Sequence, residues 1–325
     1  MQNSRQENKT LAPIALFVYN RPEHTRKVVE ALLKCPEAKD SDLIVFSDAP
    51  RGLKDIGNVR QVRDFLNKIS GFKSVKIIER KANFGLALNI ISGVSQVLDT
   101  YDNIIVLEDD IIVEKCFLEF MNKALDTYKN NKQLFSVNAC IPFNYIPQGN
   151  NLLFSDIFSC WGWATWRDCW HLYEKNPERA FNDLRNFNLR KKINLDNHVN
   201  IAWQIDANYR GEKNTWACFM NFTCAKYNML NVYPPSSIIT NIGQDGSGEH
   251  GIIGEERNGT NISLTKLNFP TGYIEDNCKN LFIGMFSDLD VEIINKYNQT
   301  VYAPNKKSKK KNKIQKFIDV IRGKI

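Results

Sequence analysis

The sequence lacks several patterns that would assign it to a familiar class of protein. No apolar run approaches the roughly 18 residues of a membrane-spanning helix, and the first ten residues are polar, so the chain has no N-terminal apolar segment. The eight cysteines are scattered and include no C-x-x-C pair, so neither a structural zinc site nor a disulfide scaffold is expected. These absences predict a protein of a reducing, cytoplasmic environment.

Two phosphate-binding motifs are also missing. There is no G-x-G-x-x-G after the first apolar run, and no G-x-x-x-x-G-K-[ST] anywhere in the chain. Their absence argues against a dinucleotide-dependent enzyme and against a P-loop nucleotide hydrolase. A bound phosphate would have to be neutralised by a metal ion on carboxylates, with Arg21 or Arg80 nearby.

The C-terminal segment is the most basic part of the chain. Residues 305–325 contain nine Lys or Arg and one Asp, a net charge of +8, so the other 304 residues sum to −1 against a total of +7. The body of the protein is therefore not expected to bind nucleic acid. From Ile314 to Ile325 apolar residues recur with helical spacing, which predicts a basic amphipathic helix on an anionic membrane surface. The alternatives are a solvated tail and a helix docked on the body.

Short apolar runs alternate with amphipathic segments in the first third of the chain. Each run predicts a buried strand, and each segment between two runs predicts a helix. This alternation is typical of the α/β class, with a mostly parallel sheet and helices on both faces. The predicted strands are residues 14–19, 43–46, 75–78 and the run that begins at 104.

Each predicted strand ends in polar residues. In open α/β sheets, ligands bind outside the carboxyl ends of the strands, so these residues predict a binding site at one edge of the sheet. The four polar ends are Asn20-Arg21, Ser47-Asp48, Arg80 and Glu108-Asp109-Asp110.

The three adjacent acids Glu108, Asp109 and Asp110 lie within an apolar run that extends from Ile104 to Val113. Burying unpartnered carboxylates is costly, and adjacent carboxylates also repel one another. A divalent cation with a phosphate ligand would satisfy them, because Mg²⁺ and Mn²⁺ prefer carboxylate oxygens. The alternative is that the acids cap a strand end in water, and the polar ends of the three other strands make this alternative weaker.

The second half of the chain contains a tryptophan-rich segment and an acid in a helical pattern. Trp161-Gly162-Trp163 is interpreted either as an apolar platform for a sugar ring or as core packing. Trp163, Trp166 and Trp170 are expected to share one helical face. Asp206 lies in a predicted helix, and its simplest role there is a surface ion pair with Arg210 at i,i+4.

A glycine-rich loop from Asn241 to Gly251 follows the last predicted strand. Such a loop can close over a ligand, with His250 available to a metal ion or a phosphate. The alternative is a connection without a function.

Taken together, these segments resemble the GT-A glycosyltransferases, which use nucleotide sugars and have a Rossmann-like half. Glu108-Asp109-Asp110 is similar to their metal-binding motif of DXD type. Val18 to Pro22 and the stretch Arg80-x-x-Asn83-x-Gly85-Leu86 resemble bacterial family-2-type members. The Glu-Asp-Asp form of the motif, Trp-Gly-Trp and the later Trp203-x-x-Asp206 resemble the eukaryotic N-acetylglucosaminyltransferases that start complex N-glycans. The resemblance covers residues 13–251.

The resemblance implies a GT-A fold and a set of site residues. Asp110 would bind Mn²⁺ or Mg²⁺ directly, with Asp109 behind it and His250 as a further ligand. Glu108 would face the ribose, and Trp161-Gly162-Trp163 would contact the acceptor. The remaining residues expected at the nucleotide sugar are Asn20, Arg21, Ser47, Asp48, Arg80, Asn83 and Gly85.

The implied reaction is an inverting transfer of a sugar from a nucleotide diphosphate, UDP by resemblance, to a hydroxyl of a glycan or lipid-linked acceptor. It would serve bacterial surface polysaccharide or glycan synthesis at the inner face of the plasma membrane. Asp206 is the expected general base, with Asp156 and Asp168 as alternatives. The competing functions are a sugar nucleotidyltransferase and a non-enzymatic protein that binds a membrane surface.

The expected domain organisation has four parts. Residues 1–12 form a disordered N-terminus, and residues 13–115 form the nucleotide-sugar-binding half of a GT-A domain. Residues 116–285 form the acceptor-binding half, and residues 286–325 form a C-terminal extension with the basic tail.

Overall fold

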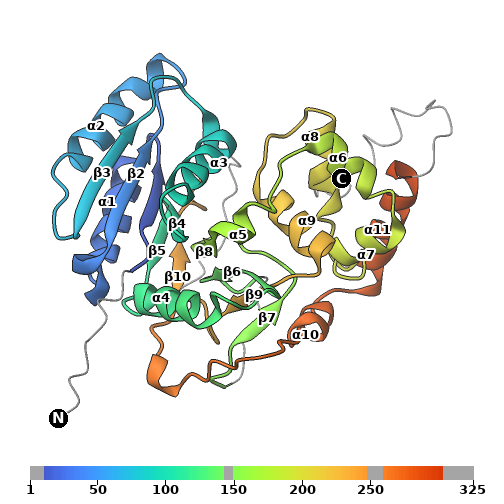
Figure 1. The fold of residues 1–325 in the computed structure, drawn as a ribbon. Coiled ribbons are helices and arrows are strands. Elements are labelled where there is room, and N and C mark those ends of the chain that lie inside the picture. The colour runs from blue at the N-terminus through green and yellow to red at the C-terminus, as the bar shows by residue number, and fades with distance from the viewer. Residues whose placement is uncertain (1–10, 143–148, 247–258, 303–325) are drawn as a thin grey trace, which may run out of the picture.

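The computed structural model describes residues 11–142, 149–246 and 259–302 (Figure 1). One large sheet runs through the molecule, and its neighbouring strands follow the order β3-β2-β1-β4-β8-β6-β9-β7. The strands are β1 (Ile14–Val18), β2 (Asp42–Ser47), β3 (Ser74–Glu79), β4 (Asn103–Glu108), β6 (Leu134–Asn138), β7 (Leu153–Ser155), β8 (Trp163–Trp166) and β9 (Leu230–Tyr233).

The strand directions confirm the predicted α/β class with a mostly parallel sheet. β1 pairs in parallel with β2 and β4, and β2 pairs in parallel with β3. β8 is antiparallel to β4 and β6, β9 is parallel to β6, and β7 is antiparallel to β9. Only β7 and β8 of this sheet therefore run against the other strands. The carboxyl ends of β1, β2, β3, β4, β6 and β9 all meet one edge of the sheet.

Helices cover both faces of the sheet in the N-terminal half. Alternate residues of β1 pack into two different apolar cores, because successive side chains in a strand point to opposite faces of the sheet. Ile14 and Leu16 pack into the core that includes α1 (Pro22–Leu32), α2 (Ile56–Leu66) and α4 (Phe117–Tyr128). Ala15 and Phe17 pack on the other face, under α3 (Gly85–Leu98).

A group of helices lies on the far side of the molecule from β3 and α2 (Figure 1). It has its own apolar core, built from residues of α6 to α9 and from Tyr297 and Tyr302 near the C-terminal end of the described chain. The remaining helices are α5 (Arg167–Trp170), α6 (Pro177–Asp183), α7 (Phe187–Ile193), α8 (Ala202–Tyr209), α9 (Ala217–Tyr227), α10 (Lys279–Ile283) and α11 (Asp288–Val301), with 3₁₀ turns at Pro36–Asp40, Leu53–Asp55 and Leu264–Lys266.

The tryptophan-rich segment differs from the prediction of one helical face. Trp163 to Trp166 form strand β8, and the short helix α5 begins only at Arg167. The reason is tertiary, because β8 fills the place between β4 and β6 and all four of its residues are buried there. The helical spacing of the tryptophans therefore predicted the wrong element, because a strand that is buried on both faces has no periodic pattern of apolar and polar residues.

Three further observations concern the sequence expectations. No helix in the described parts of the chain has the length and apolar character needed to cross a membrane. No disulfide joins any of the eight cysteines. The basic C-terminal tail and the N-terminal ten residues lie outside the described residues. The expected domain boundaries at 12/13, 115/116 and 285/286 stay predictions.

Two helical glycines provide a test of how closely α3 packs on the sheet. A Cβ at Gly93 in α3 would lie 2.5 Å from Cε1 of Phe17, whereas a Cβ at Gly57 in α2 would meet nothing within 4 Å. We expect Gly93→Ala to lower the free energy of unfolding by about 1–3 kcal/mol, because it overpacks the core. The control Gly57→Ala is expected to be neutral or to stabilise by up to about 1 kcal/mol. Chemical denaturation measures both, and equal values for the two variants would contradict this packing.

Candidate functional site

The acidic motif meets its positive partner at the edge of the sheet. β1 and β4 are neighbours, so the residues that follow them lie side by side. Nη2 of Arg21, which follows β1, donates a hydrogen bond to Oδ1 of Asp109 and lies 3.0 Å from Oδ2 of Asp110. The Tyr19 backbone N–H donates to the other Asp109 oxygen at 3.3 Å. Asp109 is 3% exposed, and Arg21 supplies the positive partner that a buried carboxylate requires.

The electrostatics of the pair are those of partly buried groups. Burial by itself would lower the pKa of Arg21, but the carboxylates of Asp109 and Asp110 outweigh it and raise that pKa. Burial also raises the pKa of Asp110, with a further increase from Asp109 and an opposing effect from Arg21. The three side chains therefore form one unit with a shared charge.

One nitrogen of Arg21 is left without a partner. Its Nη1 atom is buried and makes no hydrogen bond in the structure. An unsatisfied buried donor costs about 1–3 kcal/mol, and more when it is charged. An anionic ligand with several acceptor oxygens would satisfy it, and phosphate groups suit the planar guanidinium especially well.

A second segment also packs against Asp110. After Glu108 the chain turns and continues as β5 (Ile111–Val113), which pairs antiparallel with β10 (Ile239–Asn241). The backbone N–H of Ile242 donates to the carbonyl of Asp110 at 2.9 Å. Gly243 lies so close that a Cβ there would overlap the Asp110 carboxylate. This approach gives Gly243 a steric role.

His24 of α1 holds the same segment. Its Nε2 atom lies 3.3 Å from the Ile242 carbonyl and 3.2 Å from the Asp245 carboxylate. The first part of the predicted glycine-rich loop therefore lies against the acidic motif. His250, expected as a metal ligand, falls outside the described residues.

The residues present fit a metal ion that arrives with a phosphate rather than one held in a protein cage. No cluster of three or more His, Cys, Asp or Glu side chains with metal-binding geometry occurs among the described residues. Magnesium is commonly held by one or two carboxylates together with waters and substrate phosphates. Asp109 and Asp110 provide that donor set, and in this structure Arg21 engages both of them.

Asp48, expected at the nucleobase, organises the loops around it. It is 4% exposed and accepts hydrogen bonds from the backbone N–H groups of Ala49, Phe84 and Gly85 at 2.8–2.9 Å. The last two of these N–H groups belong to the beginning of α3, so the carboxylate stabilises the helix N-terminus. Asn83 donates from Nδ2 to the Ala49 carbonyl at 2.7 Å and joins the same network. A contact of Asp48 with a nucleobase stays a prediction.

Arg80 and Asn20 are tied into the protein. The Arg80 guanidinium donates to Asn89 at 2.9 Å and to Ser92 at 3.0 Å, and it stacks over the Phe84 ring at 4.7 Å. Burial lowers its pKa, against the opposing effect of Asp48. The Asn20 amide donates to Asp55 at 2.9 Å. Both side chains therefore shape the loops that follow the strands.

Sequence reasoning missed Arg63 of α2, which links the ends of β2 and β3. Its guanidinium donates to the hydroxyl of the fully buried Ser47 at 3.3 Å and to the Arg80 carbonyl at 3.1 Å. It also forms an ion pair with Glu79 at 3.0 Å. No local signal identified Arg63, because an arginine near the end of an amphipathic helix is ordinary.

The Trp161-Gly162-Trp163 segment lies at the same edge of the sheet as the acidic motif, but Trp163 is part of the apolar core. β8 runs opposite to β4, so its first residues lie at the edge that carries the acids. The Trp163 ring is 1% exposed and packs with Trp216 at 5.5 Å and Phe158 at 5.4 Å, so its faces are not available to a sugar. Gly162 has φ +71° and packs closely on Ala139. Trp161 is only partly buried.

The structure does not bring Asp206 to the acidic motif. Asp206 lies in α8, within the separate helical group, and is 2% exposed. Its Oδ2 atom accepts a hydrogen bond from the Tyr297 hydroxyl at 2.6 Å and lies 2.8 Å from Nη1 of Arg210. Burial raises the pKa of Asp206, with opposing effects from Tyr297 and Arg210. This is the i,i+4 pair that the sequence offered as the alternative, in a buried setting.

The two other acids considered as bases lie toward the opposite edge of the sheet. Asp156 follows β7 and Asp168 follows β8, and these two strands run against the rest. Asp156 is 7% exposed, its Oδ1 atom has no hydrogen-bond partner, and burial raises its pKa to about 6. The Asp168 side chain is 77% exposed and pairs with Lys132 at 3.3 Å.

No protein-family model and no curated protein matches the sequence. Among solved structures, TarS of S. aureus matches at 15% identity with a TM-score of 0.29, over 42% of this chain and 23% of the TarS chain. The mannosyltransferase PcManGT from Pyrobaculum calidifontis, in complex with GDP-Man and Mn²⁺, matches at 12% identity with a TM-score of 0.37, over 68% of this chain and 73% of its own. Both scores are below 0.5, so neither match decides the function.

The buried Asp156 gives a prediction about pH. Its pKa is about 6 in the folded protein against 3.8 for an ordinary aspartate, so folding favours the neutral form. Asp156 therefore makes its full contribution to the free energy of unfolding below pH 4, and this contribution is lost as the pH rises through 6. We therefore expect the unfolding free energy of Asp156→Asn, relative to the unsubstituted protein, to rise by about 3 kcal/mol between pH 4 and pH 7. Urea denaturation across that range measures it, Asp168→Asn is the exposed control, and a pH-independent difference would contradict the assignment.

Proposed function

We propose that the protein is a GT-A-type glycosyltransferase that uses a nucleotide diphosphate sugar and a divalent cation. The observation that carries this proposal is the unit of Arg21, Asp109 and Asp110 at the carboxyl edge of the parallel strands, with a buried guanidinium nitrogen that lacks a partner. A diphosphate with a divalent cation satisfies all three groups. The acceptor is a hydroxyl of a glycan or lipid-linked glycan, and the donor is a UDP-sugar.

The charges of this unit explain why a metal ion is needed. Arg21 has a formal charge of +1, and Asp109 and Asp110 have a formal charge of −1 each, so the unit has a formal charge of −1 and would repel a diphosphate. A divalent cation changes the sum to +1, which attracts it. When bound, Mn²⁺ or Mg²⁺ supplies Lewis-acid stabilisation to the leaving diphosphate. Asp110 and Asp109 would hold the cation, and Nη1 of Arg21 would donate to a phosphate oxygen.

The loops after β1, β2 and β3 form the proposed nucleoside side of the site. Asn20, Asp48 and Arg80 fix those loops through the contacts already described. In this proposal they shape the crevice, together with Ser47, Asn83 and Gly85, and Glu108 faces the ribose. In this proposal the partly buried Trp161 contacts the acceptor.

The proposed chemistry is a single displacement with inversion. A carboxylate takes the proton of the acceptor hydroxyl while that oxygen attacks the anomeric carbon and the bond to the diphosphate breaks. None of Asp206, Asp156 and Asp168 lies beside the acidic motif in this structure. We propose that transfer occurs at the cytoplasmic face of a membrane, in the synthesis of surface polysaccharide or another glycan, with the basic tail on anionic lipid.

Donor binding can be tested with a panel of nucleotide sugars. We expect one of them, in the presence of Mn²⁺, to raise the melting temperature, by the equivalent of about 2.7 kcal/mol at a hundred times its Kd. Asp110→Asn and Gly243→Ala should remove the shift, the first by deleting a ligand oxygen and the second by displacing the Asp110 carboxylate. Gly52→Ala is the control, because a Cβ there meets nothing within 4 Å.

The outcomes separate this proposal from its rivals. No response to any nucleotide sugar would count against the transferase. Release of pyrophosphate from a nucleoside triphosphate and a sugar phosphate would identify a nucleotidyltransferase instead. Vesicle binding that survives Asp110→Asn, without any nucleotide response, would favour a membrane-surface protein.

The role of Asp206 gives a separate prediction. We expect Asp206→Asn to lower the free energy of unfolding by about 1–3 kcal/mol, because it removes the buried one of the two carboxylates, Asp206 and Glu212, that pair with Arg210. Turnover by the molecules that remain folded should stay within about tenfold of the unsubstituted protein. Arg210→Gln is the matched control and should destabilise similarly. A fall in kcat by about 10²–10⁴ with unchanged stability would identify Asp206 as the base.

A further inference from the structure

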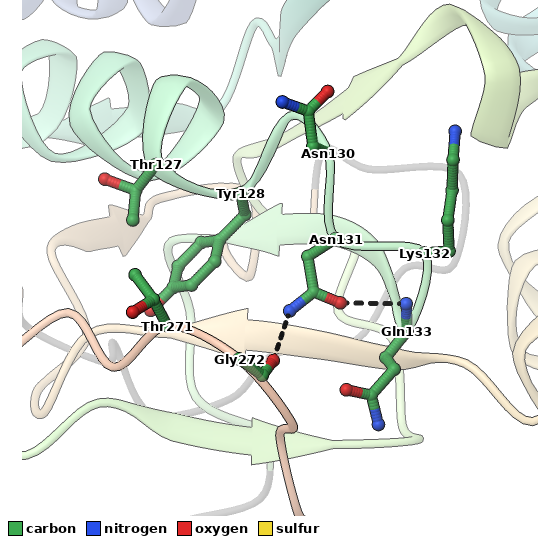
Figure 2. A pocket seen from close by; sticks show the side chains of 8 residues that line it. All are labelled: Thr127, Tyr128, Asn130, Asn131, Lys132, Gln133, Thr271 and Gly272. Atoms are coloured by element: carbon green, nitrogen blue, oxygen red, sulfur yellow. Dashed lines mark hydrogen bonds between the residues drawn. The ribbon is translucent and has the colours of Figure 1, made fainter.

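A hollow of about 400 Å³ lies at the end of α4, away from the acidic motif. It is formed where the chain leaves α4 for β6 and where a later turn passes over that connection (Figure 2). Gln133 directly precedes β6, which runs in the same direction as β4, so the hollow lies at the amino edge of the sheet. Its lining is Thr127, Tyr128, Asn130, Asn131, Lys132, Gln133, Thr271 and Gly272.

Hydrogen bonds between the two segments hold the walls in place. Asn131 donates from Nδ2 to the Gly272 carbonyl at 3.1 Å, and its Oδ1 accepts from the Gln133 backbone at 2.9 Å (Figure 2). The Gln133 amide both accepts from the Ile274 N–H at 2.9 Å and donates to the Ile274 carbonyl at 3.1 Å. The hollow is therefore preformed, which lowers the cost of ordering it around a ligand.

Tyr128 provides an unused hydrogen-bonding group in this lining. Its ring is 1% exposed, packs edge-on against Phe154 at 6.2 Å and extends from the end of α4 toward Thr271 (Figure 2). The hydroxyl is buried and has no hydrogen-bond partner. Burial raises the pKa of Tyr128, so the hydroxyl stays protonated and able to donate. A buried polar group without a hydrogen-bond partner is costly, so we expect a molecule outside the protein chain to supply that partner.

The chemistry around the hollow is neutral and rich in hydroxyl and amide groups. No carboxylate lines it, and Lys132, the one charged residue among those that form it, pairs with Asp168 at 3.3 Å. Tyr273 follows the lining residue Gly272 and is 80% exposed, which is unusual for a large aromatic side chain. Amides and hydroxyls, together with an exposed aromatic side chain one residue beyond the lining, suit a ligand with apolar C–H faces and several hydroxyl groups.

We propose that this hollow binds a neutral saccharide unit, with the Tyr128 hydroxyl as a donor to it and the Tyr273 ring against its face. The volume is within the range of small-ligand sites, about 300–1,000 Å³. The site is separate from the acidic motif and makes no demand on transfer chemistry. If the protein acts on a glycan, a second point of attachment raises the local concentration of that chain.

Native affinity electrophoresis of the full-length protein tests the proposal, in gels that contain dextran, mannan or galactan and in a gel without polysaccharide. We expect at least one of these polymers to retard the protein. Tyr128→Phe should raise the apparent Kd about three- to tenfold through loss of one hydrogen bond, without lowering the melting temperature. Tyr273→Ala should raise it by a similar factor. Tyr209→Phe and Tyr227→Ala are the controls, since both tyrosines are exposed elsewhere, at 47% and 46%.

Each outcome decides the question. Retardation that both hollow variants weaken and both controls retain would establish the site. Absence of retardation in all three polymers, or retardation that the two hollow variants leave unchanged, would overturn it and leave bound water as the partner of Tyr128. Asp110→Asn should bind the polymers like the unsubstituted protein, so failure of the transferase proposal and failure of this one are distinguishable.

Discussion

The arrangement of the site depends on the cost of burying negative charge. Asp109 is almost fully buried at the end of a central strand, and Asp110 follows it directly. Arg21 meets both carboxylates from the neighbouring strand, and its position follows from the parallel pairing of β1 with β4. The same arginine keeps one buried nitrogen without a hydrogen-bond partner, and this donor is the observation on which the proposed binding of a diphosphate rests. The segment around Gly243 also packs against the Asp110 carboxylate.

Strand direction separates the polar groups of the molecule into two sets. The loops after β1 to β4 lie at one edge and contain Arg21, Asp48, Arg80 and the acidic motif. β7 and β8 run the other way, so Asp156 and Asp168 lie toward the opposite edge, where the hollow beside Tyr128 is also found. This division removes two candidate bases from the proposed transfer site and keeps the proposed saccharide site apart from it.

The helical group is organised around Asp206. The hydroxyl of Tyr297 in α11 donates to its carboxylate, and Arg210, directly after α8, pairs with it. Tyr302, just beyond α11, donates to the Ala202 carbonyl at 2.7 Å. These contacts attach the last described helix to the body, and they occupy a carboxylate that the resemblance placed in catalysis. The acid therefore has a structural explanation that requires no substrate.

The sequence by itself determined the α/β class, the first four strands and the polar ends that they carry, because buried parallel strands are continuous apolar runs and their ends are abrupt. It also indicated that the three acids needed a positive partner. Only the tertiary structure decided that this partner is Arg21 and that Arg63 links the ends of β2 and β3, since those contacts join residues far apart in the chain. The same holds for Trp163 and Asp206, because burial depends on how β8 and α11 pack and leaves no mark in local spacing.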